Sequence, residues 1–256
     1  SKANNMKNIK VGLILTYNCE QLVQKTIDKI PKDFFDVVIS SDDGSTDETI
    51  TILKNNGIPT YQHKHMGYGG NLYSGMKIAF QDYKADYVYE LHGDAQYDFN
   101  SAIAADKQFT KENYDLILGN RFYKYNKALE NGMPLSIFLG NIFFSFIAGI
   151  LIGLYFRDLF PGFRAYNKSF FLMIKDKNFS WDYRFSFEII AISKIEKLKI
   201  GNVPTHCDYK GLRKTPPYSY AIKAFINIVI TGFFYRLAGA KLRYKYFKNE
   251  NNKNSK

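Results

Sequence analysis

The chain has 256 residues, of which 46% are hydrophobic and 17% aromatic, and 35 Lys and Arg against 24 Asp and Glu give a net charge of +11. This apolar content excludes a disordered or fibrous chain, because it can bury enough surface to offset the chain entropy. Two cysteines without a CxxC pattern argue against a disulfide framework and a zinc–thiolate cluster. The positive charge fits nucleic acid, an anionic membrane face or a phosphate-rich small substrate, and it does not choose among them.

Short apolar runs alternate with amphipathic runs over the first half of the chain. The predicted strands are Val11–Leu15, Asp36–Ser40, Thr60–His63, Tyr87–Leu91 and Asp115–Gly119. The predicted helices are Gln21–Ile30, Thr46–Asn56 and Gly70–Gln81, with Thr46 as an N-cap and Gly57 just past the end of its helix. This alternation is typical of an α/β protein with a mostly parallel central sheet flanked by helices. Ligands of such sheets bind beyond the carboxyl ends of the strands.

The second half contains a long uncharged segment, Gly132–Phe156. A run of about 20 apolar residues is long enough to span a bilayer. Asn141 and three internal glycines, at positions 140, 149 and 153, instead favour two short helices that lie in the membrane interface or pack on the core.

The C-terminal segment Ala221–Lys248 is aromatic and apolar and then strongly basic. Such a pattern is typical of an amphipathic helix at an anionic membrane surface. A helix packed on the core or at a dimer contact is the alternative. We therefore expect a catalytic domain over residues 1–215, which includes the apolar segment 132–156, and a C-terminal amphipathic helix with a basic tail over 216–256.

Polar residues follow the first, second and fourth predicted strands. Asp42 and Asp43 are adjacent carboxylates that can accept hydrogen bonds from a base imide or a ribose hydroxyl, and a turn that only caps a helix is the alternative. After the fourth strand, Asp94 and Gln96 can converge on Mg²⁺ or Mn²⁺. His92 is a candidate extra ligand or base contact, or a structural histidine.

The blocks TYN, DDGSTD and HGDAQYD, in this order, resemble the family 2 glycosyltransferases with the GT-A fold, and among them the dolichyl-phosphate mannosyltransferase type. Later segments are similar as well: Gly119–Arg121, Arg157–Tyr166, Phe187–Glu188 and Val203–Pro204. One departure is His92, which stands where the family has the first Asp of its metal motif.

The resemblance implies a set of site residues. Those expected to bind the nucleotide sugar are Thr16, Tyr17, Asn18, Glu20, Asp42, Asp43, Gly44, Gly69, Gly70, His92, Gly93 and Arg121. Those expected to contact phosphate or acceptor are Arg164, Arg213 and Lys214, and those expected to hold the metal are Asp94 and Gln96. The expected catalytic residues are Asp94, Arg164 and, as general base for a hydroxyl acceptor, Asp158.

The implied activity is inverting transfer of a sugar from a UDP- or GDP-linked donor, with Mg²⁺ or Mn²⁺, to a polyprenyl phosphate or another lipid-linked acceptor. The alternative is a soluble or growing surface-polysaccharide acceptor. A basic nucleic-acid-binding module is a remote alternative, because the strand-end carboxylates would repel phosphate. Because no signal peptide is visible, we expect a cytoplasmic enzyme, peripheral on the inner membrane face, and a homo-oligomer is compatible with the sequence.

Overall fold

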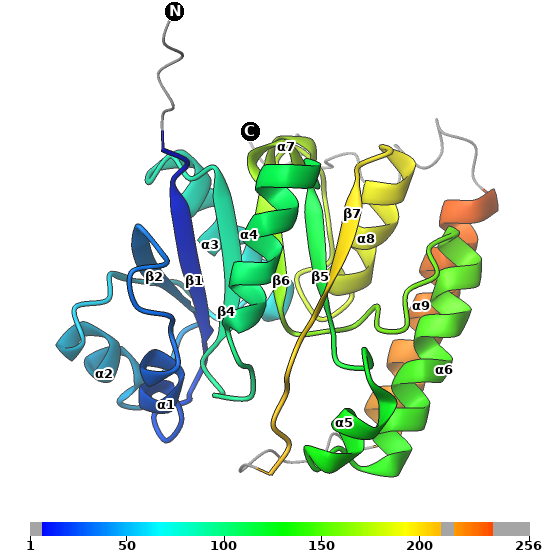
Figure 1. The fold of residues 1–256 in the computed structure, drawn as a ribbon, viewed down its shortest axis with the longest axis horizontal. Helices are drawn as coiled ribbons and strands as arrows, with labels where there is room; N and C mark the ends of the chain where they lie inside the picture. Colours follow the sequence, from blue (N-terminus) through cyan, green and yellow to red (C-terminus); the bar gives the residue numbers. More distant parts are fainter. Residues whose placement is uncertain (1–6, 211–217, 238–256) are drawn as a thin grey trace, which may run out of the picture.

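The computed structural model describes residues 7–210 and 218–237 (Figure 1). Arg213 and Lys214, for which we expected a phosphate contact, lie outside these residues, as do the basic positions after Leu237. The predictions for them stay predictions.

The described residues form one seven-stranded sheet with helices on both faces. The strands are β1 (Lys10–Thr16), β2 (Val37–Asp42), β3 (Thr60–Gln62), β4 (Tyr87–His92), β5 (Leu116–Asn120), β6 (Arg164–Asn167) and β7 (Ile200–Pro204). The helices are α1 (Val23–Asp28), α2 (Thr49–Asn55), α3 (Tyr68–Gln81), α4 (Asn100–Glu112), α5 (Tyr125–Glu130), α6 (Leu135–Ile152), α7 (Lys168–Ile174), α8 (Phe185–Ile195) and α9 (Tyr218–Leu237).

The strand order is β3-β2-β1-β4-β6-β5-β7. The pairs among β1, β2, β3 and β4 are parallel, as is β5 with β7, whereas β6 runs antiparallel between β4 and β5. The predicted mostly parallel α/β sheet is therefore confirmed. Strand β6 was not among the predicted strands, because its four residues were interpreted only as part of a motif.

Two apolar cores lie on the two faces of the sheet. Neighbouring strand residues point to opposite faces, so Leu13 of β1 joins the core under α3, α7 and α8, and Ile14 joins the core under α1, α2 and α4. In Figure 1, α4 crosses in front of the sheet and α3 lies behind it. Both faces are covered, which explains the continuous apolar runs of the central strands.

The start of α2 differs from the prediction. The helix begins at Thr49, and Thr46 does not cap it. Asp47 instead accepts a hydrogen bond from the backbone N–H of Thr49, at 3.1 Å. The end of the helix is as expected, because Gly57 has a φ of +70°, which favours glycine.

The uncharged segment forms one continuous helix, α6, so the prediction of two short helices is wrong. Gly140 and Gly149 lie inside the helix, and only Gly153, with a φ of +68°, ends it. Asn141 is accommodated because its Nδ2 donates to the carbonyl of Ile137, one turn earlier, at 2.8 Å. Within the described residues α6 is the one helix long and apolar enough to cross a membrane, a property that some core helices share.

Helix α9 lies along α6 (Figure 1). Phe225 stacks with Phe143 and Phe144, and Gly232 lies against the side chain of Leu151. The order of these contacts shows that the two helices run in the same direction. Helix α9 also contacts α8, and the boundary between residues 215 and 216 stays a prediction.

Candidate active site

Three strand ends bring the predicted polar blocks to one edge of the sheet. In the parallel registers, Thr16 of β1 lies beside Asp42 of β2, and Leu15 lies beside His92 of β4. The segments that follow these strands therefore start side by side, at the carboxyl edge where ligands of such sheets bind.

Asp42 holds the turn after β2. The side chain is fully buried, and one oxygen accepts from the backbone N–H groups of Gly44 and Ser45 at 3.2 and 2.8 Å. The other oxygen accepts from the hydroxyls of Thr16 and Ser45 at 2.8 and 2.6 Å. This geometry supports the alternative in which Asp42 stabilises a turn. Gly44 belongs to the same turn, and its φ of +84° is a conformation that favours glycine.

Asp43 holds the loop before α3. Its two oxygens accept from the backbone N–H groups of Met66 and Gly67 at 2.7 and 2.9 Å, and His65 lies 2.8 Å away. Tyr17, half-exposed, stacks on His65 with a 4.5 Å centroid distance. The two rings form an open aromatic surface of the kind that can stack on a nucleotide base.

Asn18 and Glu20 tie the loop after β1 to the loop after β2. The Asn18 side chain accepts from the N–H of Thr46 at 2.8 Å, and the Glu20 carboxylate accepts from the N–H of Glu48 at 2.9 Å. Both residues therefore shape the edge, and their contact with a nucleotide stays a prediction.

The predicted glycines are sites of close packing. A Cβ on Gly69 would lie 2.5 Å from Phe185, and one on Gly70 would lie 2.5 Å from the ring of Trp181. A Cβ on Gly93 would lie 2.8 Å from the sulfur of Cys19. These distances are too short for a side chain, so the glycines allow the 180–185 segment and the loop after β1 to approach the site.

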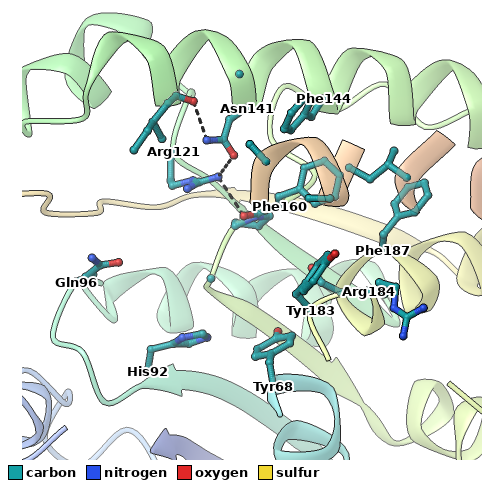
Figure 2. A pocket seen from close by; sticks show the side chains of 18 of the residues that line it. Tyr68, His92, Gln96, Arg121, Asn141, Phe144, Phe160, Tyr183, Arg184 and Phe187 are labelled. Carbon is teal, nitrogen blue, oxygen red and sulfur yellow. Dashed lines mark hydrogen bonds between the residues drawn. The ribbon is translucent and has the colours of Figure 1, made fainter. Parts of the chain in front are cut away.

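A cavity of about 500 Å³ lies between the sheet edge and the pair α6–α9 (Figure 2). Polar side chains line one part of it: His92, Asp94, Gln96 and Arg121. The part beside the helices and the 160–162 loop is rich in apolar side chains, namely Ile137, Phe144, Phe160, Phe187, Ala224 and Ile228, with polar residues such as Arg184 and Asn227 among them. The cavity thus joins the strand-end motif to the apolar helices.

Glu90, fully buried in β4, is the centre of the polar network beneath the cavity. It accepts hydrogen bonds from Tyr68 at 2.7 Å, Tyr166 at 2.6 Å and His92 Nε2 at 2.8 Å. Burial opposes the charged form, but the His92 contact and the other donors outweigh burial, and the pKa of Glu90 is lowered. Sequence reasoning missed Glu90, although a carboxylate inside the apolar run YVYEL was a usable signal.

The same contact acts in reverse on His92. Burial lowers the pKa of His92, but the hydrogen bond and charge of Glu90 outweigh it, and the pKa is raised above 6.5. The structure does not place His92 in a cluster of three or more His, Cys, Asp or Glu within the described ranges. His92 lies on the cavity wall, and its Nε2 is held by Glu90.

The Glu90–His92 pair predicts a pH dependence of stability. Because the pKa of His92 is raised, its interaction with Glu90 stabilises the fold fully below about pH 6.5, and this stabilisation is lost as pH rises through the raised pKa. Because the pKa of Glu90 is lowered, its contribution to stability is lost only in acid, below about pH 4.5. We expect the free energy of unfolding, measured with urea, to fall as pH rises above about 6.5. His92→Gln should flatten this fall, and His206→Gln, at an exposed histidine, should not; an unchanged fall in His92→Gln would contradict the assignment.

Asp94 and Gln96 both line the cavity, two residues apart, as the metal prediction requires. One oxygen of Asp94 accepts from the N–H of Gln96 at 3.2 Å. A single carboxylate and an amide oxygen fit Mg²⁺ or Mn²⁺ whose remaining ligands are diphosphate oxygens and water. The donor set fits such an ion bound together with its substrate.

Arg121 and Asp158 form a buried ion pair behind the cavity. Arg121 Nε and Nη2 donate to the two carboxylate oxygens of Asp158 at 2.7 and 2.8 Å, and the Arg121 backbone N–H donates at 3.0 Å. Asp158 has no exposed surface and does not line the cavity. This position does not support a general base, because both carboxylate oxygens accept from Arg121 and the side chain does not line the cavity.

The remaining donors of Arg121 bind three other segments. Nη1 donates to the hydroxyl of Tyr209 at 2.8 Å, and Nη2 donates to the side chain of Asn141 at 3.2 Å and to the carbonyl of Phe160 at 3.0 Å (Figure 2). Arg121 therefore joins the end of β5 to α6 and to the loop before β6. Asn141, the polar residue that was difficult to explain within an apolar helix, is the contact of α6.

Arg164 is fully buried at the start of β6 and does not line the cavity. Its guanidinium donates to the carbonyls of Ser186 at 2.8 Å and Pro161 at 3.3 Å, and it contacts the Ser186 hydroxyl. In this arrangement Arg164 links the start of α8 to β6 through hydrogen bonds. Direct binding of phosphate by Arg164 stays a prediction.

Sequence reasoning also missed several residues on the cavity wall: Tyr68, Asn141, Tyr183, Arg184 and Tyr209. No local motif marks them, because they come from four separate segments, with Tyr183 and Arg184 adjacent in the chain. Figure 2 shows Tyr183 and Arg184 on the side of the cavity opposite α6.

The sheet, its carboxyl-edge motifs and the adjoining cavity are those of the α/β class of proteins, in which ligands bind beyond the strand ends. The sequence pattern of the family described as glycosyl transferase family 2 matches residues 13–173. Because this match covers more than half of the chain, the protein belongs to glycosyltransferase family 2. The predicted family is thereby confirmed.

Two similar proteins match nearly the whole chain. One is an uncharacterized protein of Methanocaldococcus jannaschii, 29% identical over 91% of this chain and 92% of its own length. The other is the UDP-N-acetylglucosamine–dolichyl-phosphate N-acetylglucosaminyltransferase of Methanococcus voltae, 28% identical over 90% of this chain and 95% of its own.

Among solved structures, glucosyl-3-phosphoglycerate synthase from Mycobacterium tuberculosis has the same fold. Its complex with Mn²⁺, uridine diphosphate and phosphoglyceric acid superposes with a TM-score of 0.64 at 14% identity, over 91% of this chain and 80% of that one. The likeness confirms the predicted GT-A fold.

Proposed function

We propose that this glycosyltransferase transfers a sugar from a UDP-linked donor to a polyprenyl phosphate at a membrane surface. The observation that carries the proposal is the cavity, which has the Asp94 motif in its polar part and α6 and α9 along its apolar part. A phosphate with a long apolar chain matches this distribution, whereas a soluble glycan would leave the apolar wall uncovered. The Methanococcus voltae relative, whose name specifies dolichyl phosphate, supports the same choice.

Donor and metal are assigned to the sheet edge. The Tyr17–His65 rings offer a surface for the base, and Asp94 and Gln96 would hold Mg²⁺ or Mn²⁺ on the diphosphate. The bound ion would stabilise the charge that develops on the leaving diphosphate. The M. tuberculosis synthase with Mn²⁺ and uridine diphosphate on the same fold supports this assignment.

A phosphate acceptor is ionised at neutral pH, so it needs little help from a general base. This agrees with the buried position of Asp158, whose two oxygens accept from Arg121. The reaction we propose is in-line attack of an acceptor oxygen on the anomeric carbon, with departure of the nucleoside diphosphate and inversion at that carbon.

The membrane contact is assigned to an apolar face made by α6 and α9. Large apolar side chains recur every three or four residues on each helix and are exposed: Leu135, Leu139, Phe143, Phe146 and Ile150 on α6, and Ile222, Ile226, Ile230, Phe233 and Phe234 on α9. Phe143 stacks on Phe225, which lies between Ile222 and Ile226, so the two stripes meet. An apolar face of this extent on a basic protein fits the surface of an anionic bilayer, on which α6 would lie flat.

Charged residues on the apolar face should weaken membrane binding. We expect the double variant Leu139→Asp/Ile226→Asp to lose at least about tenfold in affinity for vesicles of phosphatidylcholine and phosphatidylglycerol, measured by flotation, because both sites must enter the interface. Leu172→Asp is the matched control, since Leu172 on α7 is 51% exposed but lies outside the face. Unchanged flotation of the double variant would contradict the assignment.

The activity itself is tested with purified protein, UDP-N-acetylglucosamine and other UDP-sugars, Mn²⁺ and a short polyprenyl phosphate such as geranylgeranyl phosphate. We expect a lipid-linked sugar phosphate that depends on the acceptor's phosphate and disappears in excess chelator. Transfer to a soluble glycan at a higher rate than to any polyprenyl phosphate would overturn the proposal.

A further inference from the structure

Arg184, which no motif marks, lines the cavity from the loop before α8. Within the described residues its guanidinium makes side-chain hydrogen bonds through Nε, which donates to the two carboxylate oxygens of Asp182 at 3.0 and 3.1 Å. The contact with Asp182 orients the guanidinium. It leaves the edge formed by Nη1 and Nη2 for a ligand, and this edge suits bidentate binding of a phosphate. The side chain is 42% exposed.

The loop that carries Arg184 is held firmly against the rest of the site. The carbonyl of Trp181 accepts from the N–H of Gly70 at 2.9 Å, and the close packing of Gly69 on Phe185 fixes the other end. Next to Arg184, the hydroxyl of Tyr183 accepts from Asn227 of α9 at 2.9 Å. Arg184 is thus positioned between the donor edge and the apolar helices.

The other arginine that lines the cavity, Arg121, is poorly suited to an acceptor phosphate. Arg121 donates to Asp158, Tyr209, Asn141 and Phe160, so a phosphate would have to displace those contacts. Helix α6, which forms one long wall of the cavity, has no charged residue.

We propose that Arg184 binds the phosphate of the lipid acceptor through its Nη groups, with Asp182 orienting it. This inference rests on the proposed polyprenyl phosphate acceptor. In that position Arg184 holds the acceptor beside the metal-bound donor while the apolar chain lies along α6 and α9. Its role is to bind and position the acceptor, and Asp94 acts on the donor.

The test is a steady-state comparison with geranylgeranyl phosphate and UDP-N-acetylglucosamine, or whichever UDP-sugar the wild-type enzyme uses. We expect Arg184→Ala to raise the KM for geranylgeranyl phosphate about tenfold to a hundredfold, because a charge-assisted hydrogen bond to phosphate is lost, with the donor KM within about twofold of wild type. Arg184→Lys should recover part of the loss. Lys111→Ala, at an exposed position of α4, is the control.

A binding measurement separates phosphate recognition from a structural effect. By calorimetry, wild type should bind geranylgeranyl phosphate more tightly than geranylgeraniol, and Arg184→Ala should lose that preference while retaining the melting temperature of wild type. An unchanged acceptor KM, or a rise confined to the donor KM, would overturn the role of Arg184. If wild type transfers to no polyprenyl phosphate, the proposed function fails instead.

Discussion

Asp94→Ala should reduce sugar transfer by about a thousandfold or more, because the diphosphate leaving group would lose the ion that stabilises its charge. The fold should stay intact. Among residues 7–210 and 218–237, the hydrogen bond given for the Asp94 side chain is the 3.2 Å contact with the N–H of Gln96. The measurement is initial rate with saturating UDP-sugar and Mn²⁺, with the melting temperature followed in parallel.

The Asp94 prediction has a control in the same loop and a readout that does not depend on turnover. Asp98→Asn keeps an acceptor for the N–H of Asn100 and changes a carboxylate outside the cavity, so it should retain near-wild-type activity. Calorimetric titration of Mn²⁺ in the presence of UDP should show binding in wild type and Asp98→Asn and none in Asp94→Ala. Strong Mn²⁺ binding or full activity in Asp94→Ala would remove the metal site from this loop.

Arg121→Ala should destabilise the protein by about 3–5 kcal/mol, because it leaves the Asp158 carboxylate buried without its partner. Asp158 has no exposed surface, and three donors of Arg121 bind it. Burial by itself lowers the pKa of Arg121, but the charge of Asp158 outweighs burial and the pKa is raised, so the guanidinium stays charged in the fold. Urea unfolding at neutral pH gives the free energy directly.

A double variant distinguishes an unpaired charge from a lost contact. Arg121→Met/Asp158→Leu removes both charges, and it should recover a large part of the stability lost in Arg121→Ala. Lys127→Ala, which breaks an exposed pair with Glu130 on α5, should leave the free energy of unfolding within error. A wild-type free energy in Arg121→Ala would show that the buried network contributes little.

Much of the fold follows from local sequence pattern. The first five predicted strands lie within a few residues of β1 to β5, because uninterrupted apolar runs bounded by polar turns identify strands buried on both faces. The order TYN, DDGSTD and HGDAQYD was enough to indicate the family, since each block follows a strand and meets the others at one edge. Strand β6 was not predicted because its residues were interpreted only as part of a motif, and its antiparallel direction depends on its neighbours β4 and β5.

Helix α6 shows where local pattern misleads. Glycines and an asparagine in an apolar run are signals of interruption, and they supported two short helices. In the structure the Asn141 side chain meets Arg121 and Gly149 allows the chain to turn back closely at Leu154. Asn141 and Gly149 thus make tertiary contacts between α6 and the rest of the protein. These contacts offset the weak helix propensity of the two residues.

The sequence by itself determined the sheet class, the family and the motifs at the strand ends, because these depend on residues close together in the chain. Only the tertiary structure decided which charged residues face the cavity. It showed Asp158 and Arg164 buried in structural contacts, Glu90 at the centre of a hidden network and Arg184 on the cavity wall. The physical reason is that the availability of a charged group depends on its partners, and those partners are supplied by segments distant in sequence. The net charge of +11 indicated an anionic partner, and the fold assigns Arg121 to a buried carboxylate and leaves Arg184 at the cavity.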